Sequence, residues 1–340
     1  MKTRLTRRTA FAASVALFAA AGHGTVFAQD VKERTIKFAT QNPKGHPIVS
    51  GMEKFAELVA AKSAGKIKVS LFPGGVLGAD AANLSALQGG TLEMLSMNSG
   101  ILTNVAKEFA VFDFPFMFAN AKEADTIVDG PFGKMMHEKL DAKGVHGLAF
   151  WELGFRNITN SKRPINKIED VAGLKLRVIP NTINIDWVNA LGANPTPMAF
   201  PEVYAAMESK AIDGHENPFT VINANKFYEV QKHVAITNHQ YNPQSVLISG
   251  KLWSGLSNDE KKLIADAANE AASAQRLASR EQATAALESL KKSGMQVSEP
   301  SAAEMARFRD KMKPVLDKHA AIVGADVVSA LQGELAKIRK

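Results

Sequence analysis

The stretch that decides the fold runs from Gly173 to Pro218 and reads GLKLRVIPNTINIDWVNALGANPTPMAFPEVYAAMESKAIDGHENP. Residues 174–178 alternate apolar and charged side chains, which predicts a short strand. Residues 181–191 carry apolar side chains at helical spacing before a glycine and a proline, so we predict a helix that ends there. Residues 196–200 are expected to be extended and 202–209 helical. This alternation of strand and helix indicates an α/β domain.

Arg177 comes at the end of the first of these strands. Its planar guanidinium matches the geometry of a carboxylate, which makes Arg177 the first candidate for a ligand anchor. Phe200 and the pair Glu216 and Asn217 follow at points from which they could reach the same cleft. A strand-end arginine taken alone is more often part of a structural ion pair, so the rest of the chain has to decide.

The N-terminus has the three parts of a secretory signal. Positive residues come first, an apolar run covers 10–21, and Val26, Phe27 and Ala28 offer a small-residue cleavage site. We therefore predict a signal peptide over 1–28 and an exported protein. The run is short for a retained membrane anchor. Arg7 and Arg8 leave the twin-arginine route open, and the general route is the first expectation.

Charge and composition exclude several classes of protein. The predicted signal holds four of the 41 Lys and Arg residues and no acid, so 37 basic residues face 34 acidic ones, a formal net charge of +3. No long basic run with interleaved aromatics remains, which argues against nucleic acid. The chain has no cysteine, so we expect no disulfide and no thiolate chemistry. The length that remains suits two domains better than one.

The first part of the chain predicts a parallel sheet. Strands are expected over 34–39, 67–72 and 92–97, separated by helices over 48–63 and 79–87. Ligands of such sheets bind at the carboxyl ends of the strands. Gln41 and Asn98 each follow a strand and are therefore candidate pocket residues.

The middle of the chain contains a predicted crossing between domains. Phe109 to Phe118 holds five phenylalanines, which we expect to pack in the core or between domains rather than to line a ligand site. A single helix is predicted over 121–140 and a strand over 145–151. Gly154 suggests a bend beside Arg156, after which a second sheet is expected, with separate strands over 233–237 and 245–249.

A long helix is predicted over 258–292, because Ala, Glu, Lys and Leu continue there almost without interruption. At 1.5 Å per residue it would be about 52 Å long, enough to lie across both domains. Coiled-coil pairing is the alternative, but no sustained a/d leucine seam is present, so we expect a monomer. Helices over 301–319 and 326–338 end the chain.

Motifs of catalysis and of cofactor binding are absent from the sequence. It contains no G-x-S-x-G, P-loop or H-E-x-x-H pattern, and its histidines are scattered. His215 and Glu216 are adjacent and do not form a metal-binding spacing, so neither a metal nor a cofactor is expected. An exported enzyme that acts through two carboxylates stays open, although no pair stands out.

Four segments resemble the DctP-type solute-binding proteins of tripartite ATP-independent periplasmic (TRAP) transporters. The resemblance extends over essentially the whole chain after the predicted signal. The four segments are GLKLR at 173–177, PMAFPEVY at 197–204, DGHENP at 213–218 and KFYEVQK at 226–232.

This resemblance implies a two-domain clam-shell that closes over an organic acid, with no enzymatic activity and with TRAP membrane subunits as partners. Arg177 would pair with the ligand carboxylate, Asn217 would help to hold it, Arg156 would be a second positive contact and Phe200 would pack on the ligand. Other polar contacts are implied for Gln41, Asn98 and His239. The remaining candidate is His215, which replaces a commoner glutamine. The implied domains are 29–153 with 243–282, and 154–242 with 283–340.

The motifs also favour a class of ligand. Asn98 and Ile101 stand where sialic-acid members carry a glutamate and an arginine, which lowers the odds for that sugar. The segments WELGFRN at 151–157 and TNSKRP at 159–164 look most like members that bind hexuronates such as glucuronate or galacturonate. The alternatives are a C4-dicarboxylate or another small hydroxy acid and, in a different class, an exported enzyme that acts on acidic sugars.

Overall fold

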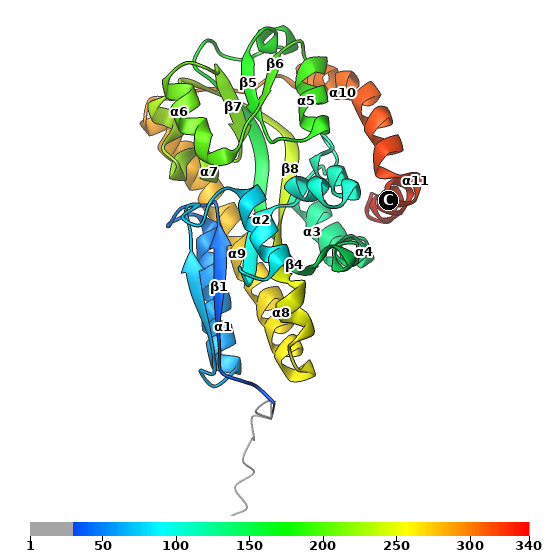
Figure 1. Cartoon of the computed structure of the whole chain (residues 1–340). Coiled ribbons are helices and arrows are strands. Elements are labelled where there is room, and N and C mark those ends of the chain that lie inside the picture. The colour runs from blue at the N-terminus through cyan, green and yellow to red at the C-terminus, as the bar shows by residue number, and fades with distance from the viewer. Residues whose placement is uncertain (1–29, 340) are drawn as a thin grey trace, which may run out of the picture.

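The computed structural model describes residues 30–339. The predicted signal peptide therefore lies outside the described residues. Within them the chain forms two lobes joined through a shared sheet (Figure 1). We call the half with β1–β3, α1 and α2 the first lobe, and the half with β5–β7, α5 and α6 the second lobe.

One mixed sheet of nine strands runs through both lobes, in the order β2-β1-β3-β8-β4-β7-β5-β6 with β9 paired to β8. The strands are β1 (Arg34–Thr40), β2 (Ile67–Phe72), β3 (Met94–Asn98), β4 (Val145–Asn160), β5 (Lys175–Val178), β6 (Asn194–Pro197), β7 (Gly214–Asn217), β8 (His233–Ser249) and β9 (Gln296–Ser298). The predicted α/β fold with two domains and hinge strands is confirmed.

Two predictions about the sheet were wrong. We expected a separate second sheet, but β4 and β8 are each long enough to pass from one lobe into the other as an antiparallel pair. We also expected a loop between strands at 233–237 and 245–249, whereas β8 is continuous. Its polar middle section stays extended because buried partners bond it: Asn242, for example, accepts from Arg156 and from Asn98.

The bend predicted at Gly154 is present in β4. The register with β8 shifts on either side of it, between Glu152 and Gly154 and again between Arg156 and Ile158. Gly154 has a φ of +119°, which L side chains rarely adopt. Such irregularities bend a strand and redirect its side chains, and here Arg156 follows directly.

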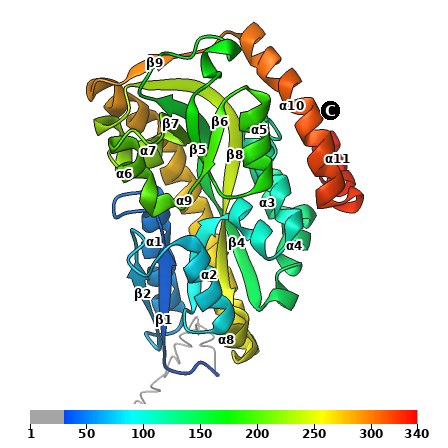
Figure 2. The same ribbon diagram turned by 45° about the horizontal axis from the view of Figure 1, so that its top comes forward.

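Helices cover both faces of the sheet (Figure 2). They are α1 (Pro47–Lys62), α2 (Asp80–Gly89), α3 (Ala121–Asp129), α4 (Pro131–Glu138), α5 (Thr182–Ala190), α6 (Val203–Glu208), α7 (Phe219–Ala224), α8 (Gly250–Ser254), α9 (Asn258–Lys292), α10 (Ala302–Val323) and α11 (Ala325–Ile338). The single helix predicted over 121–140 is two helices, because Gly130 ends the first and Pro131 begins the second.

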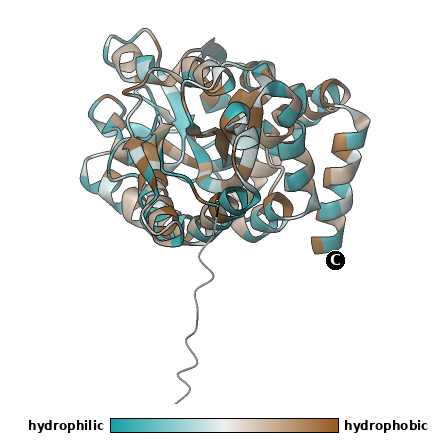
Figure 3. Ribbon diagram, turned by 60° about the horizontal axis from the view of Figure 1, so that its bottom comes forward, coloured by the Kyte–Doolittle hydropathy of each residue, from teal (hydrophilic) through white to brown (hydrophobic). Residues whose placement is uncertain are grey.

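Two apolar cores lie on opposite faces of the sheet. Neighbouring residues of β8 show the alternation: Leu247 belongs to the core beneath α2, α5 and α10, whereas Val246 and Ile248 belong to the core beneath α1 and α9. The ribbon coloured by hydropathy shows teal and brown alternating along the outer helices, as expected of amphipathic helices (Figure 3). Phe109, Phe112, Phe114 and Phe118 are buried in the first of these cores, as predicted.

The long helix α9 is found over the predicted residues, Asn258–Lys292. Ser257 and Glu260 form a capping box at its start. It packs on α1 of the first lobe, on β4 and on α7 beside the second lobe. The side chain of Gln275 bonds both backbone groups of Glu152 at 2.8 Å, so α9 holds β4 just before the bend.

Candidate ligand-binding site

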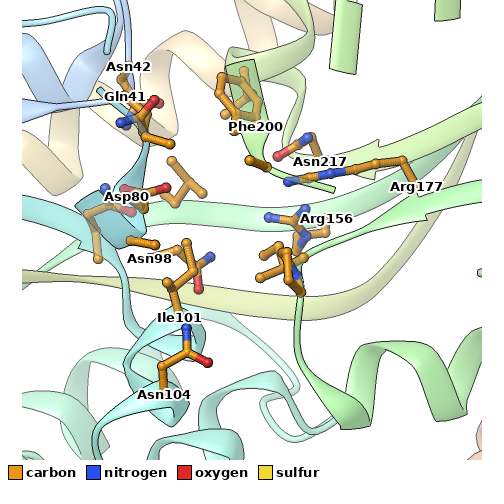
Figure 4. A pocket seen from close by; sticks show the side chains of 18 residues that line it. Gln41, Asn42, Asp80, Asn98, Ile101, Asn104, Arg156, Arg177, Phe200 and Asn217 are labelled. Atoms are coloured by element: carbon orange, nitrogen blue, oxygen red, sulfur yellow. The ribbon is translucent and has the colours of Figure 1, made fainter. Parts of the chain in front are cut away.

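A pocket lies between the lobes at the carboxyl ends of the strands (Figure 4). It has about 800 Å³ of empty space, including solvent at its mouth. The residues that line it are Gln41, Asn42, Ala79, Asp80, Ala81, Asn98, Ile101, Asn104, Leu153, Arg156, Arg177, Ile179, Pro180, Ala199, Phe200, Asn217, Val221 and Gln244. Six of the eight predicted site residues are among them.

Arg177 is a buried cation without an acidic partner. It lies on β5 and is 3% exposed, and within residues 30–339 no carboxylate forms a salt bridge with it. Its Nε and one terminal nitrogen donate to the carbonyl of Met198, at 3.0 and 2.7 Å. Burial and the nearby charge of Arg156 lower its pKa to about 10, so it remains charged at neutral pH. Its remaining N–H groups are available to a ligand.

Phe200 extends the second-lobe wall beside this cation. The guanidinium carbon of Arg177 lies 5.9 Å from the centre of the Phe200 ring, within the range of a cation–π contact. Phe227 supports the ring from behind in an edge contact at 6.0 Å. The wall therefore offers one flat apolar surface next to one charged edge.

Arg156 is also buried, but its charge is matched within the protein. Its guanidinium forms a bidentate pair with Glu216 on β7, and it further donates to the Glu216 carbonyl at 2.6 Å and to Asn242 at 2.7 Å. Burial alone would raise the pKa of Glu216, but Arg156 and the bond with His239 lower it to about 2. The four hydrogen bonds use four of the five N–H groups of Arg156 and leave one for a ligand.

The two predicted histidines lie behind the pocket and do not line it. His215 is fully buried, and its Nδ1 accepts from the amide of Asn217 at 3.0 Å. Burial lowers the pKa of His215 to about 3, so the ring is neutral and can serve as that acceptor. His239 lies on the far side of Glu216, with Nε2 at 3.3 Å from the carboxylate. His215 therefore orients Asn217, which lines the pocket, whereas His239 contacts Glu216, the partner of the pocket residue Arg156.

The first-lobe wall is formed by polar side chains that follow strands. Gln41 comes after β1 and donates to the carbonyl of Gly78 at 2.7 Å. Asn98 ends β3 and donates to Asn242 at 2.6 Å, which ties this wall to β8. Asp80 begins α2 after β2, across the pocket from Arg177 (Figure 4).

Sequence reasoning missed several of the lining residues, and Asp80 is the most important because it is charged. The rule that pointed to Gln41 and Asn98 would have found it, since Asp80 opens the element that follows β2. Asn42, Asn104 and Gln244 carried no separate signal in the sequence.

A buried polar network beneath the pocket joins the lobes to the hinge strands. The carboxylate of Asp113 accepts from Asn184 of α5 at 2.9 Å, from Asn242 of β8 at 3.1 Å, and from Asn181 at the start of α5. Burial raises the pKa of Asp113 to about 6, while the amides of Asn181 and Asn184 and the charge of Arg156 act in the opposite direction.

Neither a metal cluster nor a membrane helix is found in the part of the chain that the structure describes. No group of three or more His, Cys, Asp or Glu side chains is placed to hold a metal ion. Across 30–339, none of the helices is both long and apolar enough to span a bilayer.

Two lobes joined by hinge strands, with a charged pocket between them, define a binding protein of the clam-shell class. Residues 38–322 match the family model of DctP, "Bacterial extracellular solute-binding protein, family 7". That match covers most of the chain, so the protein belongs to this family, as the sequence motifs predicted.

Two solved structures and one curated relative show how similar the chain is to known members. A TRAP periplasmic solute-binding protein from Ochrobactrum anthropi, with its C-terminus bound in the ligand-binding pocket, is 52% identical with a TM-score of 0.83, covering 91% of this chain and 97% of its own. The sugar acid binding protein DctPAm from Advenella mimigardefordensis, in complex with galactonate, is 40% identical with a TM-score of 0.89, over 91% and 99%. The C4-dicarboxylate-binding periplasmic protein DctP of Rhodobacter capsulatus is 34% identical, over 88% and 89%.

Proposed function

We propose that the protein is the periplasmic solute receptor of a TRAP transporter, and that its ligand is a sugar acid held by its carboxylate at Arg177. It binds the acid without converting it and delivers it to the membrane subunits. Family membership and the periplasmic relatives support the receptor role.

The observation that carries the proposal is the buried, unpaired charge of Arg177. A cation taken out of water is costly unless an anion accompanies it. Arg156 already has Glu216, so a ligand carboxylate would complete the charge balance at Arg177. Asn217, held by His215, would add a donor or acceptor in a fixed direction.

The amide-rich walls favour a ligand with several hydroxyl groups. Gln41, Asn42, Asn98 and Asn104 offer neutral donors and acceptors around the rest of the pocket. A site built to bond hydroxyl groups rejects analogues that leave these amides unsatisfied. Hexuronates remain the first candidates from the sequence motifs, and the galactonate complex of a relative adds hexonates.

A C4-dicarboxylate is the second candidate, because the Rhodobacter relative is described as binding such acids. It would use Arg177 for one carboxylate. The residual N–H of Arg156 would be the nearest donor for a second charged group, but Glu216 already occupies most of that guanidinium.

Calorimetry with the purified protein tests the proposal. Galacturonate, glucuronate, galactonate, succinate and malate are titrated, and we expect stoichiometric binding of at least one sugar acid and no binding of succinate. Arg177→Ala should weaken binding roughly 100-fold or more, since about two charged hydrogen bonds are lost. Arg307→Ala, at an exposed arginine of α10, is the control.

Three results would contradict parts of the proposal. Unchanged affinity in Arg177→Ala would remove the anchor. Binding of succinate in preference to every sugar acid would select the second candidate. Conversion of the ligand during incubation, followed by NMR, would favour the exported enzyme.

A further inference from the structure

The pocket contains a second charged group without a partner, the carboxyl group of Asp80. It occupies the first turn of α2 on the first-lobe wall, across from Arg177 (Figure 4). The residue is partly exposed, but its Oδ1 atom is buried and has no hydrogen-bond partner. No salt bridge joins Asp80 to a basic side chain within residues 30–339.

The charges of the pocket can be assigned to pairs. Arg156 is matched by Glu216, which leaves Arg177 on one wall and Asp80 on the other. A ligand carboxylate at Arg177 would match that cation and leave Asp80 as the unmatched charge. The group that the ligand presents to Asp80 then determines whether the complex is stable.

Two kinds of ligand differ sharply at this point. A hydroxyl group can donate to the free Oδ1, and a hydrogen bond to a charged acceptor is favourable. A second carboxylate has no proton to donate, and two carboxylates that share a site repel each other unless one of them is protonated.

On the basis of the proposed function, we propose that Asp80 determines specificity. The pocket selects acids whose far end carries hydroxyl groups, and it binds a second carboxylate only when a proton is taken up at the same time. The proposal assigns the anchoring of the carboxylate to the second lobe and the discrimination between monoacids and diacids to the first.

The surroundings of Asp80 support proton uptake near neutral pH. Burial raises its pKa to about 7 against the opposing charge of Arg177. α2 has no other ionisable side chain, and neither has β3, which packs on it. Lys251 of α8 bonds the carbonyl of Gly89 at the opposite end of α2. The histidines of β8, at 233 and 239, lie beyond its pairing with β3, which runs from Gln244 to Ile248.

Matched ligand pairs test the proposal, because an aldonate and its aldarate differ only at the last carbon. We would titrate galactonate against galactarate and gluconate against glucarate by calorimetry, in buffers of different ionisation enthalpy. At pH 8 the protein should prefer each aldonate by about tenfold, which is the cost of protonating Asp80 at that pH so that the second carboxylate can bind. Binding of an aldarate at pH 8 should take up about one proton per ligand.

Asp80→Asn keeps the size of the side chain and removes its charge. The preference for the aldonate at pH 8 should fall to about twofold or less, and the proton uptake with the aldarate should disappear. Asp259→Asn is the matched control, since Asp259 is an exposed carboxylate in the first turn of α9. A thermal unfolding midpoint near that of the wild type shows that each variant is folded.

The outcomes separate this inference from the proposed function. Equal affinity of the wild type for both members of a pair, or an unchanged preference in Asp80→Asn, overturns the role of Asp80 and leaves the receptor role intact. If galacturonate, glucuronate, galactonate and gluconate all fail to bind, the proposed function is overturned, and the role of Asp80 with it.

Discussion

Arg156 and Glu216 form a buried ion pair between β4 and β7, with each side chain 1% exposed. The pair lies directly beneath the pocket and includes two bonds from the guanidinium to the carboxylate. Because β4 passes into both lobes, this pair joins the second lobe to the hinge. Buried pairs of this kind are costly to break, since the remaining charge is left without a partner.

Replacing Glu216 by glutamine should destabilise the protein by about 3–5 kcal/mol, because Arg156 loses its counter-ion. Urea unfolding at pH 7 measures the change. The control is Glu57→Gln, which breaks the exposed pair of Lys54 and Glu57 and should cost less than about 1 kcal/mol. Similar losses of stability in the two variants would show that the buried pair is no more costly to break than the exposed one.

The pH dependence of stability should contain a term from His46. Burial lowers the pKa of His46 to about 3, so the unfolded chain binds a proton near pH 6 that the folded protein does not. Stability from this group is therefore complete above the ordinary value of 6.5 and is lost as the pH falls toward 3.

His46→Asn isolates this term. His46 caps α1 by accepting from the backbone of Ile48, and asparagine can cap in the same way without titrating. Between pH 6 and 4 the free energy of unfolding of the variant should fall by about 1.4 kcal/mol less per pH unit than that of the wild type. This difference is the contribution of one bound proton. Urea unfolding across this range gives both slopes, and equal slopes would mean that His46 becomes protonated in the folded protein.

Gly51 should tolerate no side chain, because α1 lies close to α9 there. A Cβ atom on Gly51 would lie 2.7 Å from Gln275 and 2.9 Å from Trp151. Gly51→Ala should therefore destabilise the protein by about 1–3 kcal/mol, as overpacking does. Gly333→Ala in α11 is the matched control, since nothing lies within 4 Å of its Cβ position, and it should stabilise by up to about 1 kcal/mol. Thermal unfolding should show a lower midpoint for Gly51→Ala and an unchanged or higher midpoint for Gly333→Ala.

Asp113→Ala should weaken the contact between the lobes. It would leave the amides of Asn181, Asn184 and Asn242 without an acceptor in a buried site. Each lost bond to this carboxylate is worth about 1.5–3 kcal/mol, and part of the loss should appear as weaker ligand binding. Calorimetry together with urea unfolding measures both effects. Asp310→Ala, which breaks only the exposed pair of Asp310 and Lys313 in α10, is the control, and equal effects would contradict the role of the network.

Much of the fold could be predicted from local signals. The helix over 258–292 was predicted with the observed bounds because its composition is helical throughout. Short apolar strands such as β1 and β2 were also predicted. In each case the local pattern and the tertiary structure favour the same conformation.

Strands with polar sequences, such as β7 and the middle of β8, could not be predicted in this way. β7 reads GHEN and β8 contains NHQYNP, so neither shows the alternation of apolar and polar side chains that identifies a strand. Their side chains are buried among polar partners from distant parts of the chain, such as Arg156. No local pattern reports such partners.

The site was predicted better than its supports. Arg177 and Asn217, predicted from two separate motifs, both line the pocket, whereas His215 and His239 lie behind it. His215 and Asn217 are two residues apart on β7 and share one face of the strand, but only Asn217, at the carboxyl end of the strand, reaches the pocket. Their role as direct ligand contacts stays a prediction that this arrangement does not favour.

Arg177 and Asp80 stand on different lobes, and this separation makes the pocket modular. Under the proposed roles, the second lobe binds the carboxylate that all organic acids share, and the first lobe contacts the groups that distinguish them. Substitutions in the first-lobe wall should then change specificity while the proposed anchor at Arg177 stays in place. A combinatorial library at Gln41, Asp80 and Ile101 should yield receptors for new acids that still depend on Arg177.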